Sequence, residues 1–342
     1  MAEKDHNPEL LQYLYEKARQ TGHPLSAHYE LTYRCNLACK HCYLKGADCP
    51  EKSTEDILGA LETLAGAGVI FLTLTGGEPL IREDFFDIAS HARKLNFALR
   101  IFTNGTLIDN TAADMLAGLN PFEIGISIYG AGSQTHDSIT GVQGSFEKSL
   151  NAVSAISSRG IRTTVKSVLM KQNFDEYEEM IELAGSLGAS YTFDPTVFPC
   201  DNRDPAPLKM RLNDSQLEKV LTDRRLTKNA AARCRGPVCD LNHVCLGISP
   251  SGEIFPCIQL RRSCGNIFSD PVDAIVKSID RTVAPLTDEK KLELCYNCEL
   301  KDSCTRCPGL ALLEDGSETA PSSWACRIAR IREKVRNNEF SR

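Results

Sequence analysis

Residues 31–43 read Leu31-Thr-Tyr-Arg-Cys-Asn-Leu-Ala-Cys-Lys-His-Cys-Tyr43 and place three cysteines, Cys35, Cys39 and Cys42, within eight consecutive residues. At this C-x3-C-x2-C spacing, three thiolates can hold three corners of a four-iron, four-sulfur cube. The fourth iron then has no protein ligand and can bind and activate another molecule, whereas a cluster with four cysteine ligands usually carries electrons or supports structure. The run therefore predicts an iron–sulfur site with one open coordination position.

A strand pattern precedes the cysteines and starts a regular alternation of strands and helices between about residues 27 and 195. We expect strands at 27–33, 71–75, 98–103, 123–128, 163–169 and 191–194. We expect helices at 54–65, 85–95, 112–119, 145–158 and 174–187. Such alternation is typical of right-handed βαβ units and a parallel sheet. The sequence therefore predicts an α/β fold, either an open curved sheet or part of a barrel.

Polar motifs follow the first four expected strands. The cysteines follow the first strand, Thr75-Gly-Gly-Glu-Pro79 follows the second, Thr103-Asn-Gly105 follows the third, and Ser127 closes the fourth. Active sites of parallel α/β folds lie at the carboxyl ends of the strands. Two adjacent glycines let the backbone approach a ligand closely and adopt positive φ. We therefore expect the Gly76-Gly77 turn to contact a ligand through its amide and carbonyl groups.

Composition excludes several classes of partner. The chain of 342 residues has a formal net charge of −6 and no basic run of five or more, so we expect neither nucleic acid nor an anionic membrane surface as partner. No apolar stretch reaches about 18 residues, the length needed for a membrane span. Residues 1–24 form the pattern of a charged amphipathic helix and lack the apolar core of a signal peptide. We therefore expect a cytoplasmic protein.

The 15 cysteines are an odd number and are unevenly placed, which favours metal ligation over a disulfide framework. Ten fall between residues 234 and 326, after a stretch at 196–232 that resembles a linker with one helix at 215–222. In this rear region we expect a hairpin of strands 244–249 and 253–258 and a last helix over about 326–336. The rear cysteines include a C-x2-C-x5-C-x2-C run formed by Cys295, Cys298, Cys304 and Cys307, with Cys326 beyond it.

Taken together, the cysteine triad, the Gly76-Gly77-Glu78-Pro79 turn and the rear cysteines resemble the radical S-adenosylmethionine (SAM) enzymes that carry a SPASM extension. The resemblance covers about residues 27–335. It implies a partial (β/α)6 TIM-like barrel followed by a small cysteine-rich SPASM domain. The expected divisions are an N-terminal helix over 1–26, a radical SAM core over 27–195, a linker over 196–232, a SPASM domain over 233–335 and a tail over 336–342.

The resemblance also implies a reaction and a set of cofactor contacts. The reduced cluster at the triad would donate one electron to SAM, and the resulting 5′-deoxyadenosyl radical would abstract hydrogen from an unactivated C–H bond. The electron would come from a reductant such as ferredoxin or flavodoxin. The methionine amino group of SAM would contact Gly76, Gly77 and Glu78. The remaining SAM contacts would come from Asn104 and Ser127 at the ribose or carboxylate, Tyr43 near the adenine and, as a weaker candidate, Lys166.

Two auxiliary four-iron clusters follow from the same resemblance, which makes three clusters in all. One would be bound by Cys295, Cys298, Cys304 and Cys326. The other would be bound by Cys239, Cys257 and Cys307, with a fourth ligand from Cys234, which we favour, or from Cys245. If neither binds, substrate could occupy the free iron. The run departs from the family in one place, because only Thr305 and Arg306 precede the fourth cysteine, where the family often has three residues.

Several other interpretations of the cysteines stay open. The triad spacing could be the apolar face of a helix, or could bind zinc with His41; the rear cysteines could form a zinc ribbon. Cys49, Cys200 and Cys264 have no assigned cluster. Cys200 could donate a hydrogen atom or bind substrate, although a bystander thiol is the preferred interpretation. Asp194 could act as a general base or be a structural carboxylate.

Three functions are compatible with these motifs. The first is hydrogen abstraction from a ribosomally synthesised peptide. Peptide maturases of this group often carry an N-terminal recognition domain, and only about 26 residues precede the first strand here, so we expect that domain to be absent or supplied by another chain, which weakens the peptide interpretation. The second is the same chemistry on a small molecule, such as a porphyrin or quinone precursor. The third is a non-catalytic iron–sulfur electron carrier, which the open triad and the Gly-Gly-Glu-Pro turn disfavour.

Overall fold

A computed structural model describes residues 8–227, 239 and 245–340 of the chain. Its centre is an eight-stranded sheet in the order β6-β5-β4-β3-β2-β1-β7-β8, in which β1 to β6 run parallel. The strands are β1 (Ser26–Glu30), β2 (Phe71–Thr75), β3 (Ala98–Thr103), β4 (Glu123–Ser127), β5 (Thr163–Val168), β6 (Ser190–Asp194), β7 (Cys245–Ile248) and β8 (Ile254–Phe255). The six consecutive parallel strands confirm the predicted α/β architecture of a partial TIM-like barrel.

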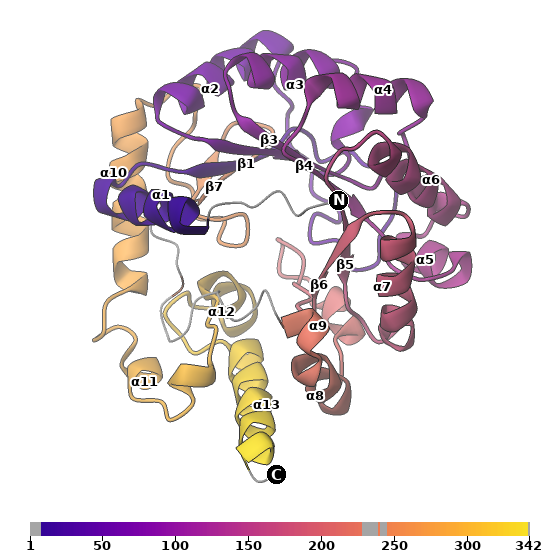
Figure 1. The fold of residues 1–342 in the computed structure, drawn as a ribbon. Coiled ribbons are helices and arrows are strands. Elements are labelled where there is room, and N and C mark those ends of the chain that lie inside the picture. Colours follow the sequence, from indigo (N-terminus) through magenta and orange to yellow (C-terminus); the bar gives the residue numbers. More distant parts are fainter. Residues whose placement is uncertain (1–7, 228–238, 240–244, 341–342) are drawn as a thin grey trace.

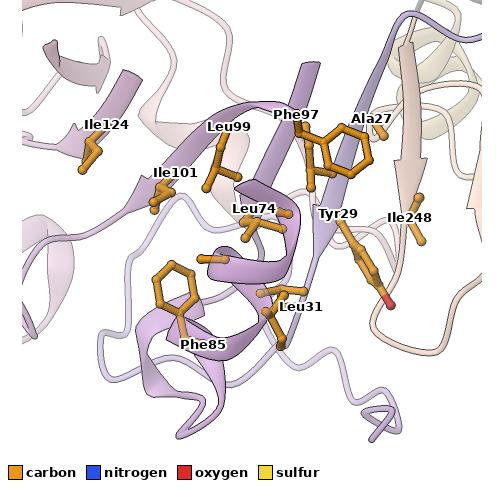
Figure 2. Close-up of a cluster of buried hydrophobic side chains, with 14 of the residues drawn as sticks. Ala27, Tyr29, Leu31, Leu74, Phe85, Phe97, Leu99, Ile101, Ile124 and Ile248 are labelled. Carbon is orange, nitrogen blue, oxygen red and sulfur yellow. The ribbon is translucent and has the colours of Figure 1, made fainter. Parts of the chain in front are cut away.

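Helices cover the convex side of this curved sheet (Figure 1). They are α2 (Thr54–Gly66), α3 (Phe85–Lys94), α4 (Asn110–Leu119), α6 (Ser145–Ser158) and α7 (Tyr177–Ser186). Alternate strand residues such as Leu74, Leu99 and Ile101 point toward them and form the main core with Phe85 of α3 (Figure 2). Because successive strand residues face opposite sides of a sheet, Arg100 and Phe102 face the concave side. The residues that pair in register with Arg100 on this face, His28, Thr73 and Glu123, are polar.

The predicted hairpin of the rear region is present, because β7 pairs with β8 in antiparallel orientation. The hairpin is not separate from the main sheet, however, because β7 also pairs in parallel with β1. Figure 2 shows Ile248 of β7 beside Tyr29 of β1 in the same apolar layer. Without β7, the backbone groups along one side of β1 would lie at an open edge. The rear region thus extends the sheet of the front region.

The C-terminal helices lie across the open side of the sheet, between β7 and α8 (Asp214–Thr222) (Figure 1). Helix α13 (Ser323–Phe340) packs against α8 through an apolar cluster that includes Leu217, Trp324 and Ile328. It begins before Cys326 and continues beyond Arg336, so residues 336–340 belong to a helix and not to the expected tail. This helix pair connects the end of the chain to the segment that follows β6.

The remaining elements are shorter or lie at the margins. They are α1 (Pro8–Thr21), α5 (Ser133–Thr140), α9 (Arg224–Thr227), α10 (Val272–Val283), α11 (Glu293–Tyr296), α12 (Pro308–Asp315) and the 3-10 turns Pro79–Ile81, Phe174–Glu176, Ala206–Met210, Ala284–Leu286 and Lys301–Ser303. Helix α1 contributes Ala18 to a small apolar cluster with Leu25 and Phe71. No helix in the described part of the chain has both the length and the hydropathy needed to cross a membrane.

Candidate active site and auxiliary cysteine sites

The three cysteines of the triad lie in a loop directly after β1, at the carboxyl end of the sheet. Helix α5 holds one side of this loop, because the amides of Ala38 and Lys40 donate to the carbonyl oxygens of Thr140 and Ile139 at 2.8 and 3.0 Å. The other side is held by Glu51, which pairs with Arg34 at 2.7 Å and with Arg82 at 3.1 Å. The triad is thus fixed by contacts with distant segments.

The three thiols lie close enough to influence one another electrostatically. Burial and the neighbouring Cys42 and Cys35 thiols raise the pKa of Cys39 to about 12, and burial also raises the pKa of Cys35 and Cys42. Three thiolates therefore cannot form here without a compensating positive charge. Bound iron supplies that charge and deprotonates its thiol ligands. The donor set consequently fits an iron–sulfur cluster.

Gly76 and Gly77 approach the triad loop more closely than any other residue type would allow. A Cβ on Gly76 would lie 2.2 Å from the carbonyl oxygen of Thr32, and a Cβ on Gly77 would lie 2.2 Å from that of Arg34. The amides of Gly77 and Glu78 donate to these two carbonyl oxygens at 2.7 and 2.9 Å. The sequence led us to expect both amides to face a ligand. Instead, they bind the backbone that leads into the triad, which leaves the carbonyl groups of the turn as candidate ligand contacts.

The Glu78 side chain is fully buried and joins β2 to β3. Its carboxylate accepts hydrogen bonds from the Thr103 hydroxyl at 2.7 Å, the Asn104 amide at 2.7 Å and the Leu80 amide at 3.1 Å. Burial raises the pKa of this carboxyl group to about 7, against the lowering effect of the three donors. Glu78 therefore sets the relative positions of the Gly-Gly turn and the end of β3, both of which border the triad.

Asn104 connects the end of β3 to the triad itself. Its side-chain amide donates to Asn36 Oδ1 at 2.9 Å and lies 3.9 Å from the Cys35 sulfur. Its Oδ1 accepts from Thr106, which in turn accepts from the Asn36 side chain at 2.8 Å. The structure thus places the Asn104 side chain against the triad loop.

Ser127 and Lys166 are paired neighbours on β4 and β5. Ser127 hydrogen-bonds Tyr129, whose ring makes an edge contact with His41 at 4.5 Å between centroids. Burial and the negative character of the nearby triad thiols raise the pKa of Tyr129. Lys166 reaches over the Phe102 ring on the concave side, 4.2 Å from its centroid. Ser127 is therefore linked to the triad loop through Tyr129, whereas the described contacts of Lys166 lie at the Phe102 ring.

Tyr43 takes part in a buried charge network that the sequence did not predict. Its hydroxyl donates to Glu30 at 2.8 Å, and Glu30 pairs with Arg261 from the rear region at 2.7 Å. Arg261 also pairs with Asp201 at 2.6 Å and donates to the Tyr33 hydroxyl at 2.8 Å. Burial raises the pKa of Asp201 to about 6. The Tyr43 ring thus contacts the Arg261 guanidinium, besides any contact with an adenine.

Asp194 and Cys200 both make contacts with backbone groups. Asp194 is exposed at the end of β6 and accepts from the Thr196 amide at 2.8 Å, which is a local turn contact. Cys200 is buried and its thiol lies 3.7 Å from the Cys42 carbonyl oxygen, to which it donates. These contacts favour the structural carboxylate and the bystander thiol among the interpretations left open by the sequence.

The rear cysteines form two groups. Cys304 lies within electrostatic range of Cys326, Cys295 and Cys298, and these neighbours together with burial raise its pKa to about 11. Cys257 lies within range of Cys245, and Cys307 within range of Cys257. The first group matches the predicted ligands of one auxiliary cluster.

The second group contains two predicted ligands, Cys257 and Cys307, brought together by close backbone packing. A Cβ on Gly309 would lie 2.0 Å from the Gln259 carbonyl oxygen, so the start of α12 rests directly on the turn after Cys257. Cys239 packs against the same core as Cys257. The favoured fourth ligand, Cys234, lies outside the described residues. Cys245 is a close neighbour of Cys257, but its thiol also hydrogen-bonds Ser26.

Single-metal sites do not emerge from this geometry. Within residues 8–227, 239 and 245–340, no group of three or more His, Cys, Asp and Glu side chains is arranged to hold one metal ion. A zinc ion needs its ligands within about 2.0–2.3 Å, whereas a four-iron cluster spreads its cysteines over separate irons.

Sequence reasoning missed the residues that hold the triad from a distance. Glu30 and Arg261 carry no local motif, because each acts through a partner more than 200 positions away. Helix α5 has few apolar residues, and only the flanking Gly132 and Gly141 signal its ends. Tyr129 has no recognisable signal at all. Each of these residues depends on the assembled barrel for its role.

Comparison with known proteins agrees with the geometry of both regions. The Radical SAM superfamily matches residues 29–184, and the iron–sulfur cluster-binding SPASM domain matches residues 239–299. The structure of SuiB from Streptococcus suis bound to S-adenosylmethionine has the same fold, with a TM-score of 0.69 over 95% of this chain and 84% of that chain at 18% identity.

Two curated relatives differ in what they make. Pre-heme d1 synthase of Dinoroseobacter shibae is 38% identical over 174 residues, which are 50% of this chain and less than half, 43%, of that protein. Mycofactocin maturase of Mycolicibacterium smegmatis is 28% identical over 303 residues, 82% of this chain and 77% of that protein. With its triad loop at the end of β1 and its clustered rear cysteines, the chain belongs to the radical SAM superfamily, is a radical SAM enzyme and carries a C-terminal SPASM iron–sulfur domain.

Proposed function

We propose that this enzyme abstracts hydrogen from an unactivated C–H bond of a ribosomally synthesised peptide. The observation that carries the chemistry is the triad loop, which is locked to the Gly76-Gly77 turn and to Asn104 at the carboxyl end of the sheet. When bound at Cys35, Cys39 and Cys42, a four-iron cluster with SAM supplies a carbon radical strong enough for that abstraction.

The chain's own residues bind and orient SAM around the triad. The carbonyl groups of Gly76 and Gly77 would accept hydrogen bonds from the methionine ammonium. Asn104, Ser127 and Lys166 would contact its carboxylate and ribose, and Tyr43 would lie on the adenine side. Glu78 acts indirectly, because all three hydrogen bonds to its carboxylate come from the β2 and β3 ends. This division of roles separates binding residues from a residue that positions them.

The rear region holds two auxiliary four-iron clusters. One is bound by Cys295, Cys298, Cys304 and Cys326, whose thiols neighbour one another in the structure. The other is bound by Cys239, Cys257 and Cys307, with Cys234 as fourth ligand. This assignment makes residues 27–195 the radical SAM core, 196–232 the linker and 233–335 the SPASM domain. Anaerobic reconstitution should then give about 12 iron atoms per chain, from three four-iron clusters.

A peptide substrate is supported by two of the relatives that share most of this chain. The mycofactocin maturase matches 82% of it, and the subtilosin biosynthesis protein AlbA of Bacillus subtilis matches 82% at 29% identity. A separate peptide-recognition protein and a reductant such as ferredoxin or flavodoxin would complete the system. Neither nucleic acid nor a membrane takes part.

The test is anaerobic turnover with SAM, dithionite and a short peptide encoded beside the gene. We expect 5′-deoxyadenosine to form and the peptide to lose hydrogen, both measured by mass spectrometry. With a peptide deuterated at the reacting carbon, deuterium should appear in the deoxyadenosine. The Cys39→Ala variant is the control and should give neither product. Deoxyadenosine without any change in the peptide would refute the peptide assignment and leave the SAM chemistry intact.

A tetrapyrrole precursor is the second candidate substrate, favoured by two relatives. Pre-heme d1 synthase matches half of this chain at 38% identity, and the AdoMet-dependent heme synthase of Methanosarcina barkeri matches 86% of it at 28% identity. The same assay with a porphyrin precursor in place of the peptide tests this candidate. Deoxyadenosine formation that depends on the porphyrin and not on the peptide would decide for it.

A further inference from the structure

Arg306 is a buried cation between the two auxiliary cysteine groups. It stands between Cys304 and Cys307 in the sequence, in the shortened gap of the rear cysteine run, and its residue is only 3% exposed. Its Nε and Nη2 atoms donate to the Ala320 carbonyl oxygen at 3.1 and 2.9 Å, and Nη2 also donates to that of Glu318. All of these partners are neutral backbone groups.

One end of this guanidinium has no oxygen partner, and its nearest side-chain contact is the Cys295 thiol. Nη1 is buried and makes no hydrogen bond within the part of the chain that the structure describes. A buried donor without a partner is costly, and a buried charge without a counter-charge is more so. A negatively charged hydrogen-bond acceptor near this N–H group would remove that cost.

The nearest candidates for that counter-charge are sulfur atoms. The positive charge of Arg306 acts on the thiols of Cys295, Cys326 and Cys307, lowering their pKa values against the larger opposite effect of burial. A four-iron cluster with four thiolate ligands carries net negative charge, which increases on reduction. Such a cluster at Cys295, Cys298, Cys304 and Cys326 would supply the missing partner.

A second arginine approaches the same group from α13. Arg332 donates to the Ser303 carbonyl oxygen at 3.3 Å and to the Thr305 hydroxyl at 3.1 Å, and its charge reaches Cys304. The other cysteine group has Arg261 beside Cys257, and the charge of Arg261 is neutralised by ion pairs with Glu30 and Asp201. Arg306 also acts on Cys307 of that group, but Arg332 does not. Among the described residues, the first site therefore has the greater net positive charge around it.

We propose that Arg306, together with Arg332, is a positioning residue that donates a hydrogen bond to the cluster at Cys295, Cys298, Cys304 and Cys326 and makes it the more easily reduced of the two auxiliary clusters. A buried cation stabilises the reduced, more negative state more than the oxidised state, and hydrogen bonds to cluster sulfur act in the same direction. This inference rests on the ligand assignment of the proposed function.

The test is a potentiometric titration of the reconstituted full-length chain, followed by electron paramagnetic resonance. The triple variant Cys35→Ala, Cys39→Ala, Cys42→Ala serves as background, so that only the auxiliary signals remain. In Arg306→Met we expect the one-electron reduction constant of one auxiliary cluster to fall at least tenfold, which is a shift of about 59 mV to more negative potential. Arg306→Lys should recover part of the shift, because it restores the charge without the planar fork.

The matched control is Arg262→Met, because Arg262 is exposed and pairs only with Glu318 at 2.9 Å among the described residues. It should leave both potentials unchanged. If Arg306→Met fails to assemble its cluster, Arg332→Met decides: a negative shift of the same signal supports the proposal, and an unchanged potential overturns it. Unchanged potentials in an intact Arg306→Met also overturn it. An iron count that lacks the four irons of this site in the unmutated chain refutes the ligand assignment instead.

Discussion

Replacing Arg261 by methionine should destabilise the protein by about 3–5 kcal/mol, because it leaves a buried carboxylate without its cation. Glu30 is completely buried, and Arg261 donates to both of its oxygens at 2.7 and 2.9 Å. The same guanidinium pairs with Asp201 at 2.6 Å, and the Asp201 side chain is 27% exposed. Water can therefore compensate Asp201 in part, whereas it cannot reach Glu30. Most of the expected loss comes from Glu30.

The neighbouring Arg262 provides the matched control. Its side chain is 49% exposed and its pair with Glu318 lies at the surface, so Arg262→Met should cost about 0–1 kcal/mol. Urea unfolding of the two variants and the unmutated protein, followed by circular dichroism, measures both values. The double variant Glu30→Gln, Arg261→Met should recover part of the loss, since no buried charge is then left unpaired. Equal destabilisation in Arg261→Met and Arg262→Met would refute the reasoning.

Three further predictions concern the triad itself. Gly77→Ala should abolish iron binding at the triad, because the new Cβ would lie 2.2 Å from the Arg34 carbonyl oxygen. Gly59→Ala is the control and should retain iron binding, because a Cβ at this position of α2 meets open space. Iron analysis of the two variants makes the comparison. Burial raises the pKa of Glu78 from its ordinary 4.5 to about 7, so between these pH values the folded state binds more protons than the unfolded state. The free energy of unfolding should therefore fall as the pH rises from 4.5 to about 7. In urea titrations at several pH values, Glu78→Gln should flatten this dependence. Cys200→Ser should keep the rates of deoxyadenosine and product formation within about threefold of the unmutated enzyme, a difference below about 1 kcal/mol. The reason is that a serine hydroxyl can still donate to the Cys42 carbonyl oxygen. Loss of product with deoxyadenosine formation retained would instead indicate that the thiol donates a hydrogen atom.

Contacts between segments distant in the sequence explain why the triad is more than a metal-binding peptide. Its loop is fixed by α5, by the Gly76-Gly77 turn and by the turn at Asp201, whose amide donates to the Tyr43 carbonyl oxygen at 3.0 Å. Arg261 adds a connection from the SPASM domain to the end of β1. A change in the rear region can therefore reach the front site through a single side chain.

Local sequence patterns were sufficient to predict the repeating elements and the chemistry of the cysteines. Strand and helix periods depend on residues two to four positions apart, and the triad ligands lie within one loop, so both can be recognised locally. The six parallel strands and the expected helices of the barrel agree closely with the structure. The Cys295, Cys298, Cys304 and Cys326 group was also foreseen, although only by resemblance to a family.

The groups that meet across the barrel could be identified only once the chain had been placed in three dimensions. It placed β7 beside β1, filled the space at Gly76 and Gly77 with the chain's own backbone, and paired Glu30 with Arg261. It also left Nη1 of the buried Arg306 without a protein partner in the described region. The physical reason is that burial and charge compensation depend on which surfaces pack together, and a pattern of neighbouring residues does not contain that information.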